Sequence, residues 1–174
     1  MSKPTDIRPV GLTAYYLPVE ARIPYRFGTE LLSHVTCIRI CIEVETGTGG
    51  RHHGWGETPL NVQWAWPSTL SIADRLEAVT ALCGDLAQRW ATFDRLGHPI
   101  EVGHAFLRDV LPVALAEINR VRSGDPIPWL AALVANSAFD LALHDAYGNA
   151  HSQPTYATYT QEWMNDDLAA YLSP

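Results

Sequence analysis

The clearest pattern in the chain is an alternation of apolar and polar residues over residues 36–46. A period of two predicts a β-strand with one buried face and one face in water. A looser strand is predicted over residues 7–17, and a short one over residues 52–58 that returns antiparallel after the glycine-rich turn at 47–50. We therefore expect a three-stranded antiparallel sheet, with a loop over residues 18–30. The apolar positions of the clearest strand are Ile38, Ile40, Ile42 and Val44.

The rest of the chain has helical periodicity. A first apolar stripe spans residues 72–90, with Ser71 among the capping residues before it and Gly97 beyond its end. A second stripe spans residues 107–121 and is interrupted by Pro112, which predicts a kink or two short helices. A last helical piece is predicted for residues 161–172. The stripes consist of Ile72, Leu76, Val79, Cys83, Leu86 and Trp90, and of Leu107, Leu111, Ala114, Ile118 and Val121.

A third helix, over residues 128–149, is apolar around most of its circumference. Its polar residues form a narrow stripe, with Asp145 standing apart. A helix of this kind has to be buried on more than one side. We expect the sheet and the other helices to cover one side and a structure outside this chain to cover the other. The stripe consists of Asn136, Ser137, Asp140 and His144.

Composition narrows the class of protein. The chain has 174 residues, the length of one domain, with 47% hydrophobic and only 18% charged residues. Its net charge of −7, without any basic run, argues against nucleic acid or an anionic membrane as partner. The start has no secretory signal, and no apolar stretch is long enough to span a bilayer. Three cysteines without paired spacing favour reduced thiols and a cytoplasmic location.

Three short motifs occur in a fixed order on this layout of a sheet followed by helices. Residues 54–59 read GWGETP, residues 138–148 read AFDLALHDAYG and residues 153–156 read QPTY. Together they resemble the N-terminal capping domain of the enolase superfamily, in the mandelate racemase/muconate-lactonizing enzyme group. The resemblance covers residues 7–159, and residues 160–174 are then the start of a linker or helix towards a barrel. It implies an α+β fold in which the three-stranded sheet is followed by a bundle of three to four helices.

The resemblance also implies a partner that carries the chemistry. In that family a (β/α) barrel holds Mg²⁺ and the lysine or histidine bases that remove a proton next to a substrate carboxylate. This chain has no Lys-x-Lys pair, and its single lysine is Lys3. We therefore expect no catalytic residue, metal or cofactor on this chain. Mg²⁺ is implied only for the complete enzyme, whose partners would be the barrel, as a domain or as a chain, and a small carboxylate substrate.

Two loops of such a cap close over the substrate. In the first, residues 22–28, arginine suits a carboxylate and aromatic rings shape an apolar pocket. The alternative for this loop is a solvated surface. In the second loop, after Glu57, which also holds Asn61 and Gln63, the tryptophans would cap the substrate or pack on the barrel rim. The candidate substrate-binding residues are Arg22, Tyr25, Arg26, Phe27, Trp64 and Trp66.

Two other constellations resemble metal or acid–base sites. His52 and His53 are neighbours on a strand and point to opposite faces, so they cannot bind one ion together. Asp140 and His144 share a helix face, but a buried polar stripe bonded across an interdomain interface accounts for them better. The residues assigned to that interface are Glu57, Asp140, His144 and Asp145.

These observations lead to one functional hypothesis and two alternatives. The chain is expected to be the substrate-capping and specificity domain of a dehydratase, racemase or cycloisomerase, inactive alone. It could instead be a binding or assembly module that pairs with a separately encoded barrel or forms a homo-oligomer through the third helix. The other alternative is a truncated gene product that needs a barrel partner.

Overall fold

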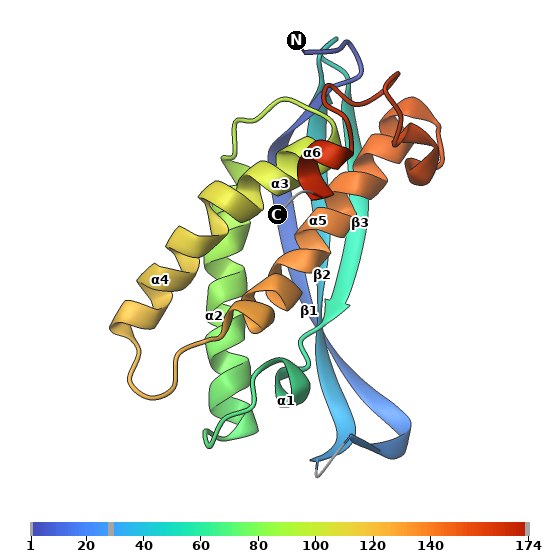
Figure 1. The fold of residues 1–174 in the computed structure, drawn as a ribbon. Helices are drawn as coiled ribbons and strands as arrows, with labels where there is room; N and C mark the ends of the chain where they lie inside the picture. The colour runs from blue at the N-terminus through green and yellow to red at the C-terminus, as the bar shows by residue number, and fades with distance from the viewer. Residues whose placement is uncertain (1, 28–29, 173–174) are drawn as a thin grey trace.

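The computed structural model describes residues 2–27 and 30–172, without the side chains of Phe27, Glu30 and Leu172. Three antiparallel strands, β1 (Ile7–Phe27), β2 (Glu30–Thr46) and β3 (Arg51–Pro59), form one sheet in the order β1-β2-β3. The helices lie on one face of this sheet (Figure 1). The predicted α+β class and the three-stranded antiparallel sheet are confirmed.

Helices are present over the predicted residues 72–90 and 128–149, and the predicted range 107–121 is covered by two helices, the first of which begins earlier, at Pro99. Ser71 caps α2 by accepting a hydrogen bond from the Asp74 amide. The second apolar stripe is divided between two helices that meet at Val110, because Pro112 is compatible only with the first turn of a helix. The helical elements are α1 (Val62–Ala65), α2 (Ile72–Ala91), α3 (Pro99–Asp109), α4 (Leu111–Val121), α5 (Trp129–His151), the 3-10 helix η1 (Thr155–Thr158) and α6 (Ala169–Leu172).

Two predictions about local structure are wrong. The loop expected over residues 18–30 is largely strand, because β1 continues to Phe27 and forms with β2 a long ribbon that extends beyond the helices (Figure 1). Pro18 and Pro24 are tolerated there because β1 is an edge strand. The helix expected over residues 161–172 is confined to α6. Asp167 accepts a hydrogen bond from the Ala169 amide, a side-chain bond of the kind that begins a helix, so α6 starts only after Asp167.

The core lies between the sheet and the helices. The predicted apolar face of β2 is fully buried there. Trp90 of α2 stacks on Phe106 of α3, with ring centroids 4.0 Å apart, and donates a hydrogen bond of 2.9 Å to Asn136 Oδ1 of α5. The polar residue at position 136 is therefore satisfied inside the chain, as buried polar groups require.

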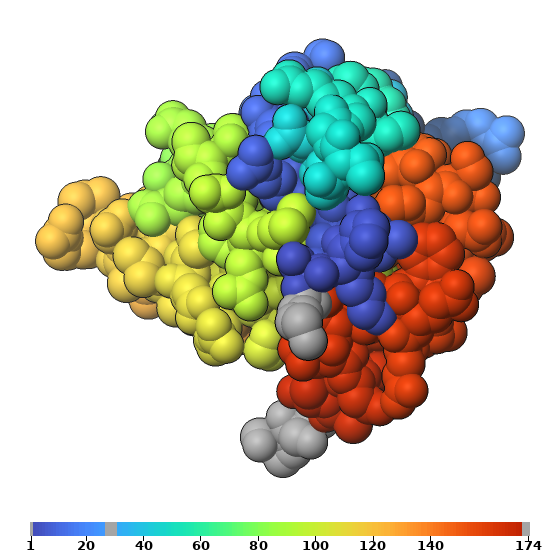
Figure 2. Space-filling view, turned by 90° about the horizontal axis from the view of Figure 1, so that it is seen from above, coloured from blue at the N-terminus to red at the C-terminus, as the bar shows by residue number. Residues whose placement is uncertain are grey.

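The segment after η1 returns to the start of the chain. Figure 2 shows the C-terminal segment (red) beside the first residues (dark blue). Asn165 donates hydrogen bonds to the carboxylates of Asp6 and Glu101, and Glu101 also caps α3 by accepting from the His98 amide. Residues 160–172 therefore pack on this domain, while the domain boundary at residue 159 stays a prediction. Within the described residues, no helix combines the length and hydropathy needed to cross a membrane.

Candidate functional site

The motif over residues 54–59 places backbone against backbone. A Cβ atom on Gly54 would lie 2.1 Å from the backbone nitrogen of Ala146, and one on Gly56 would lie 2.1 Å from the carbonyl oxygen of Ala138. Such distances leave no space for a side chain, so only glycine lets α5 approach β3 this closely. The small residue Ala142 lies between these two contacts. The residues that carry the family resemblance thus set the distance between helix and strand.

Asp145 completes this junction. Its carboxylate accepts a hydrogen bond of 2.8 Å from the backbone amide of Trp55, on the free edge of β3. Asn149 donates to the same carboxylate and, at 3.0 Å, to the carbonyl oxygen of His53. Two side chains of α5 therefore satisfy backbone groups that an edge strand leaves open.

The four residues predicted for an interdomain interface line a single open groove. Glu57 comes from β3, and Asp140, His144 and Asp145 come from α5. The groove has a volume of about 390 Å³. Its other lining residues are Trp55, Gly56, Leu141, Thr155, Tyr156 and Tyr159.

The charges in this groove follow from burial. His144 Nδ1 shares a hydrogen bond of 2.7 Å with the Tyr159 hydroxyl, and its Nε2 lies 3.8 Å from Asp140 Oδ2. Burial lowers the pKa of His144 and raises the pKa of Asp140, and it raises the pKa of Tyr159 to about 12. His144 is therefore neutral near pH 7. Asp140 also rests on Gly103 of α3, where a Cβ atom would lie 2.3 Å from Oδ1.

The chain itself covers most of α5. The helix packs on β2 and β3 of the sheet, and α2, α3 and α4 also contact it. Leu130 and Leu141 stay exposed along the remaining strip, which continues into the groove. We expected an outside structure to cover half of this helix. The chain leaves only a narrow strip of the helix for such a structure to cover.

The described residues contain no group of three or more histidine, cysteine or acidic side chains that could hold a metal ion. Glu57 is bound to Arg39, with 2.6 Å between Oε2 and the guanidinium. Mg²⁺ prefers several oxygen ligands in octahedral geometry, and these residues do not supply them.

A second candidate region lies where the ribbon meets the segment after β3. Tyr25 of the ribbon and Asn61 line a groove of about 220 Å³ whose walls are largely apolar. The side-chain oxygen Oδ1 of Asn61 is buried, and none of the described residues donates a hydrogen bond to it. An unpaired buried acceptor costs about 1–3 kcal/mol, so a donor from outside would be favourable. The amide was predicted to lie in the second loop but not to be a site residue.

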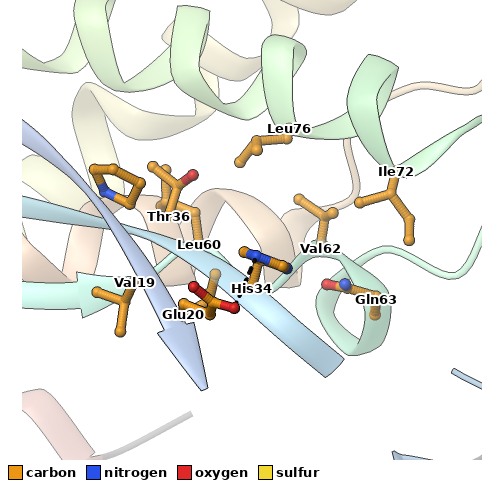
Figure 3. Close-up of a pocket in the computed structure, with 11 residues that line it drawn as sticks. Val19, Glu20, His34, Thr36, Leu60, Val62, Gln63, Ile72 and Leu76 are labelled. Carbon is orange, nitrogen blue, oxygen red and sulfur yellow. Dashed lines mark ion pairs between the residues drawn. The ribbon is translucent and has the colours of Figure 1, made fainter. Parts of the chain in front are cut away.

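The adjoining groove, shown in Figure 3, has a volume of about 360 Å³ and lies between the ribbon base, α1 and the start of α2. Val62 and Gln63 of α1 line it, together with Ile72 and Leu76 of α2. Glu20 and His34 pair across the two strands, with Nε2 and Oε1 3.9 Å apart. This pair was not predicted, because residues 18–30 were expected to form a loop and only the strand register brings the two side chains together.

The other predicted substrate-binding residues do not converge. Arg22 and Arg26 are exposed on the ribbon and are not among the residues that line these two grooves. The Phe27 side chain lies outside the described residues. Trp64 is partly exposed on α1, whereas Trp66 is 2% exposed and packs in the core. The structure thus brings Tyr25 and Asn61 to one groove, and Gln63 of the second loop to the adjoining groove.

Comparison with known proteins gives a match in fold. No protein-family model matches the sequence, and no curated protein matches it. An enolase from alpha pretobacterium bal199 with bound Mg matches with a TM-score of 0.52 and 16% identity, over 87% of this chain and 34% of that one. A dipeptide epimerase from Cytophaga hutchinsonii matches at 0.49 and 17%, over 86% and 32%. A mandelate racemase/muconate lactonizing protein from Herpetosiphon aurantiacus matches at 0.43 and 14%, over 87% and 33%.

This chain therefore spans about a third of the length of the solved structures it matches. At such low sequence identity the similarity shows the fold alone. It rests on the match to the enolase, which has a TM-score of 0.52. The sheet order and the helices on one face agree with the fold that the motifs predict. The chain has the α+β fold of an enolase N-terminal domain.

Proposed function

We propose that this chain is the substrate-capping and specificity domain of a carboxylate-transforming enolase-superfamily enzyme, a dehydratase, racemase or cycloisomerase, and that it is inactive alone. The observation that carries the proposal is the coverage: the fold accounts for 87% of this chain but 34% of a magnesium-bound enolase. The remaining two thirds of such an enzyme would supply the bases and hold the Mg²⁺.

The two grooves at the ribbon end support the capping role. Their walls combine apolar side chains with a few polar groups, the composition of small-molecule sites. Tyr25 would pack against the apolar part of a substrate, and Asn61 would accept a hydrogen bond from it. Arg22 and Arg26 on the exposed ribbon would bind a carboxylate through their guanidinium groups. Closure of these elements over the barrel would exclude water from the reacting centre.

A binding or assembly module remains the second candidate, because Leu141 and Tyr156 are exposed beside the α5 groove. Such a module would use the same strip to hold a separately encoded barrel or a second copy of the chain. A gel-filtration profile of the purified chain separates the two occupants. Self-association through the strip gives a dimer, whereas a surface for a barrel leaves a monomer until the barrel is added.

The test is reconstitution with the barrel polypeptide encoded in the same genome, either in frame after the Pro174 codon or as a separate gene. The expected result is a complex that turns over a carboxylate in the presence of Mg²⁺. Tyr25→Ser should raise KM about tenfold, the effect of losing one apolar contact with the substrate. Val121→Ser, at an exposed apolar residue of α4, is the matched control and should change nothing. Kinetics that are indifferent to changes at both Tyr25 and Asn61 would refute the capping role.

A further inference from the structure

Exposed apolar side chains surround the groove between β3, α5 and η1. Trp55, Leu141 and Tyr156 are 50%, 51% and 84% exposed, respectively, and all three line it. A contiguous exposed apolar area rimmed by polar groups marks an interaction surface. Its position on the uncovered strip of α5 makes it the surface where a covering polypeptide would contact this chain.

The carboxylate of Asp140 has one partner inside this groove, His144, whose Nε2 lies 3.8 Å from Oδ2. Burial lowers the pKa of His144, so this histidine is neutral near pH 7 and leaves the charge of the carboxylate uncompensated. The side chain of Asp140 is 40% exposed and faces the groove. A partly desolvated carboxylate without a cation favours a positively charged group from outside.

The neighbouring carboxylates are already bound within the chain. Glu57 is paired with Arg39, and Asp145 accepts hydrogen bonds from the Trp55 amide and from Asn149. Of the three carboxylates in the groove, Asp140 is therefore the one whose negative charge is available to a group that binds from outside. The chain's net charge of −7 adds a general attraction for a basic partner.

The aromatic rings favour arginine over lysine. Tyr156 of η1 and Tyr159, directly after it, both line the groove. Their rings lie edge to face, with centroids 5.6 Å apart. A planar guanidinium can stack on an aromatic ring while its N–H groups bond a carboxylate, which the compact ammonium of lysine does less well. We infer that the groove between β3, α5 and η1 binds an arginine side chain of the covering polypeptide, with Asp140 as its carboxylate partner. The identification of that polypeptide as the barrel rests on the proposed function.

The test uses the full chain and a small probe. N-acetyl-L-arginine methylamide is titrated into the ¹⁵N-labelled chain and followed by amide chemical shifts. The expected result is millimolar binding, with shifts confined to residues 55–57, 137–148 and 155–159. The Asp140→Asn variant should weaken it about tenfold or more, the size of one charge-assisted hydrogen bond. Glu77→Gln removes an exposed acidic charge on α2 and is the matched control, which should bind like the unchanged chain.

A neutral probe separates charge from shape. N-acetyl-L-citrulline methylamide has nearly the same shape as the arginine probe but no charge, and it should bind at least about tenfold more weakly. Equal binding of the two probes, shifts elsewhere on the chain, or an Asp140→Asn variant that binds arginine unchanged would each overturn the inference. An unperturbed spectrum outside the groove shows that this variant still folds.

This outcome is independent of the reconstitution experiment. A barrel that binds and turns over substrate while the arginine probe fails would refute only the arginine site. An arginine probe that binds through Asp140 while no barrel associates would refute the proposed function and leave a surface for basic segments.

Discussion

The β3–α5 junction and the ribbon end of the sheet are built in opposite ways. At the junction, helix and strand meet backbone to backbone through Gly54 and Gly56, and Asp145 satisfies the strand edge. At the ribbon end, Tyr25 is exposed and the Asn61 side-chain oxygen has no donor among the described residues. Gly54, Gly56 and Asp145, which belong to the motifs, thus maintain packing, whereas Tyr25 and Asn61 at the ribbon end belong to no motif.

Of the changes considered for the junction, replacing Gly54 or Gly56 by alanine should reduce the stability of the fold most. Gly56→Ala would place a Cβ atom 2.1 Å from the Ala138 carbonyl oxygen, so α5 would have to move away from β3. We expect a loss of at least about 3 kcal/mol in the free energy of unfolding, the scale of severe overpacking. Chemical denaturation measures it. Gly84→Ala, on the exposed face of α2 with open space around its Cβ, should instead stabilise by up to about 1 kcal/mol.

Acid should weaken the buried side of the molecule before the ribbon. His98 caps α3, is fully buried against Tyr147, and burial lowers its pKa from 6.5 to about 4. The unfolded chain therefore binds this proton more readily, so stability is lost as the pH falls from about 6.5 to 4. The loss should be about 3 kcal/mol, measured by denaturation at several pH values.

Two variants test the origin of that loss. His98→Asn keeps a capping side chain and should flatten the dependence on pH in this range. His34→Asn changes an exposed histidine at the base of the ribbon and should leave the pH dependence of stability unchanged. An unchanged slope in His98→Asn would assign the acid sensitivity to other groups.

The strand-edge bond of Asp145 should contribute less. Asp145→Ala removes the acceptor for the Trp55 amide and should cost about 1–2 kcal/mol. Asp94→Ala provides the matched comparison, because its pairing with Arg8 is on the surface and should count for less than about 0.5 kcal/mol. Equal effects of the two substitutions would mean that Asp145 does not support the junction.

Changes on the ribbon should have the smallest effect on folding. Ile23 is 72% exposed, so Ile23→Ser should change stability by less than about 0.5 kcal/mol. Thermal unfolding checks this. A large loss would show that the ribbon is part of the core and would remove the contrast between the two regions.

Periodicity was enough to predict the sheet and helices α2 and α4, because one face of each element is buried. Helix α5 was predicted instead from its long run of apolar residues, and the first two turns of α3, from Pro99, were not predicted. Periodicity failed at the ribbon, where Ile23 and Tyr25 are exposed and leave no alternating pattern. It also failed after Thr160, where Asn165 bonds to Asp6 and Glu101, a long-range arrangement that local sequence does not encode. Of the candidate site residues, the α5 set was predicted to share a surface because helical spacing places Asp140 and His144 on one face. The pairing of Glu20 with His34 depended on strand register.

Proton exchange is the most direct measurement of where the chemistry lies. The purified chain is incubated in D₂O with Mg²⁺ and a panel of small carboxylates, and loss of the α-proton signal is followed by NMR. A capping domain alone should give no exchange above that of buffer, and exchange should begin when the barrel polypeptide is added. Magnesium-dependent exchange by the chain alone would contradict its assignment as a cap.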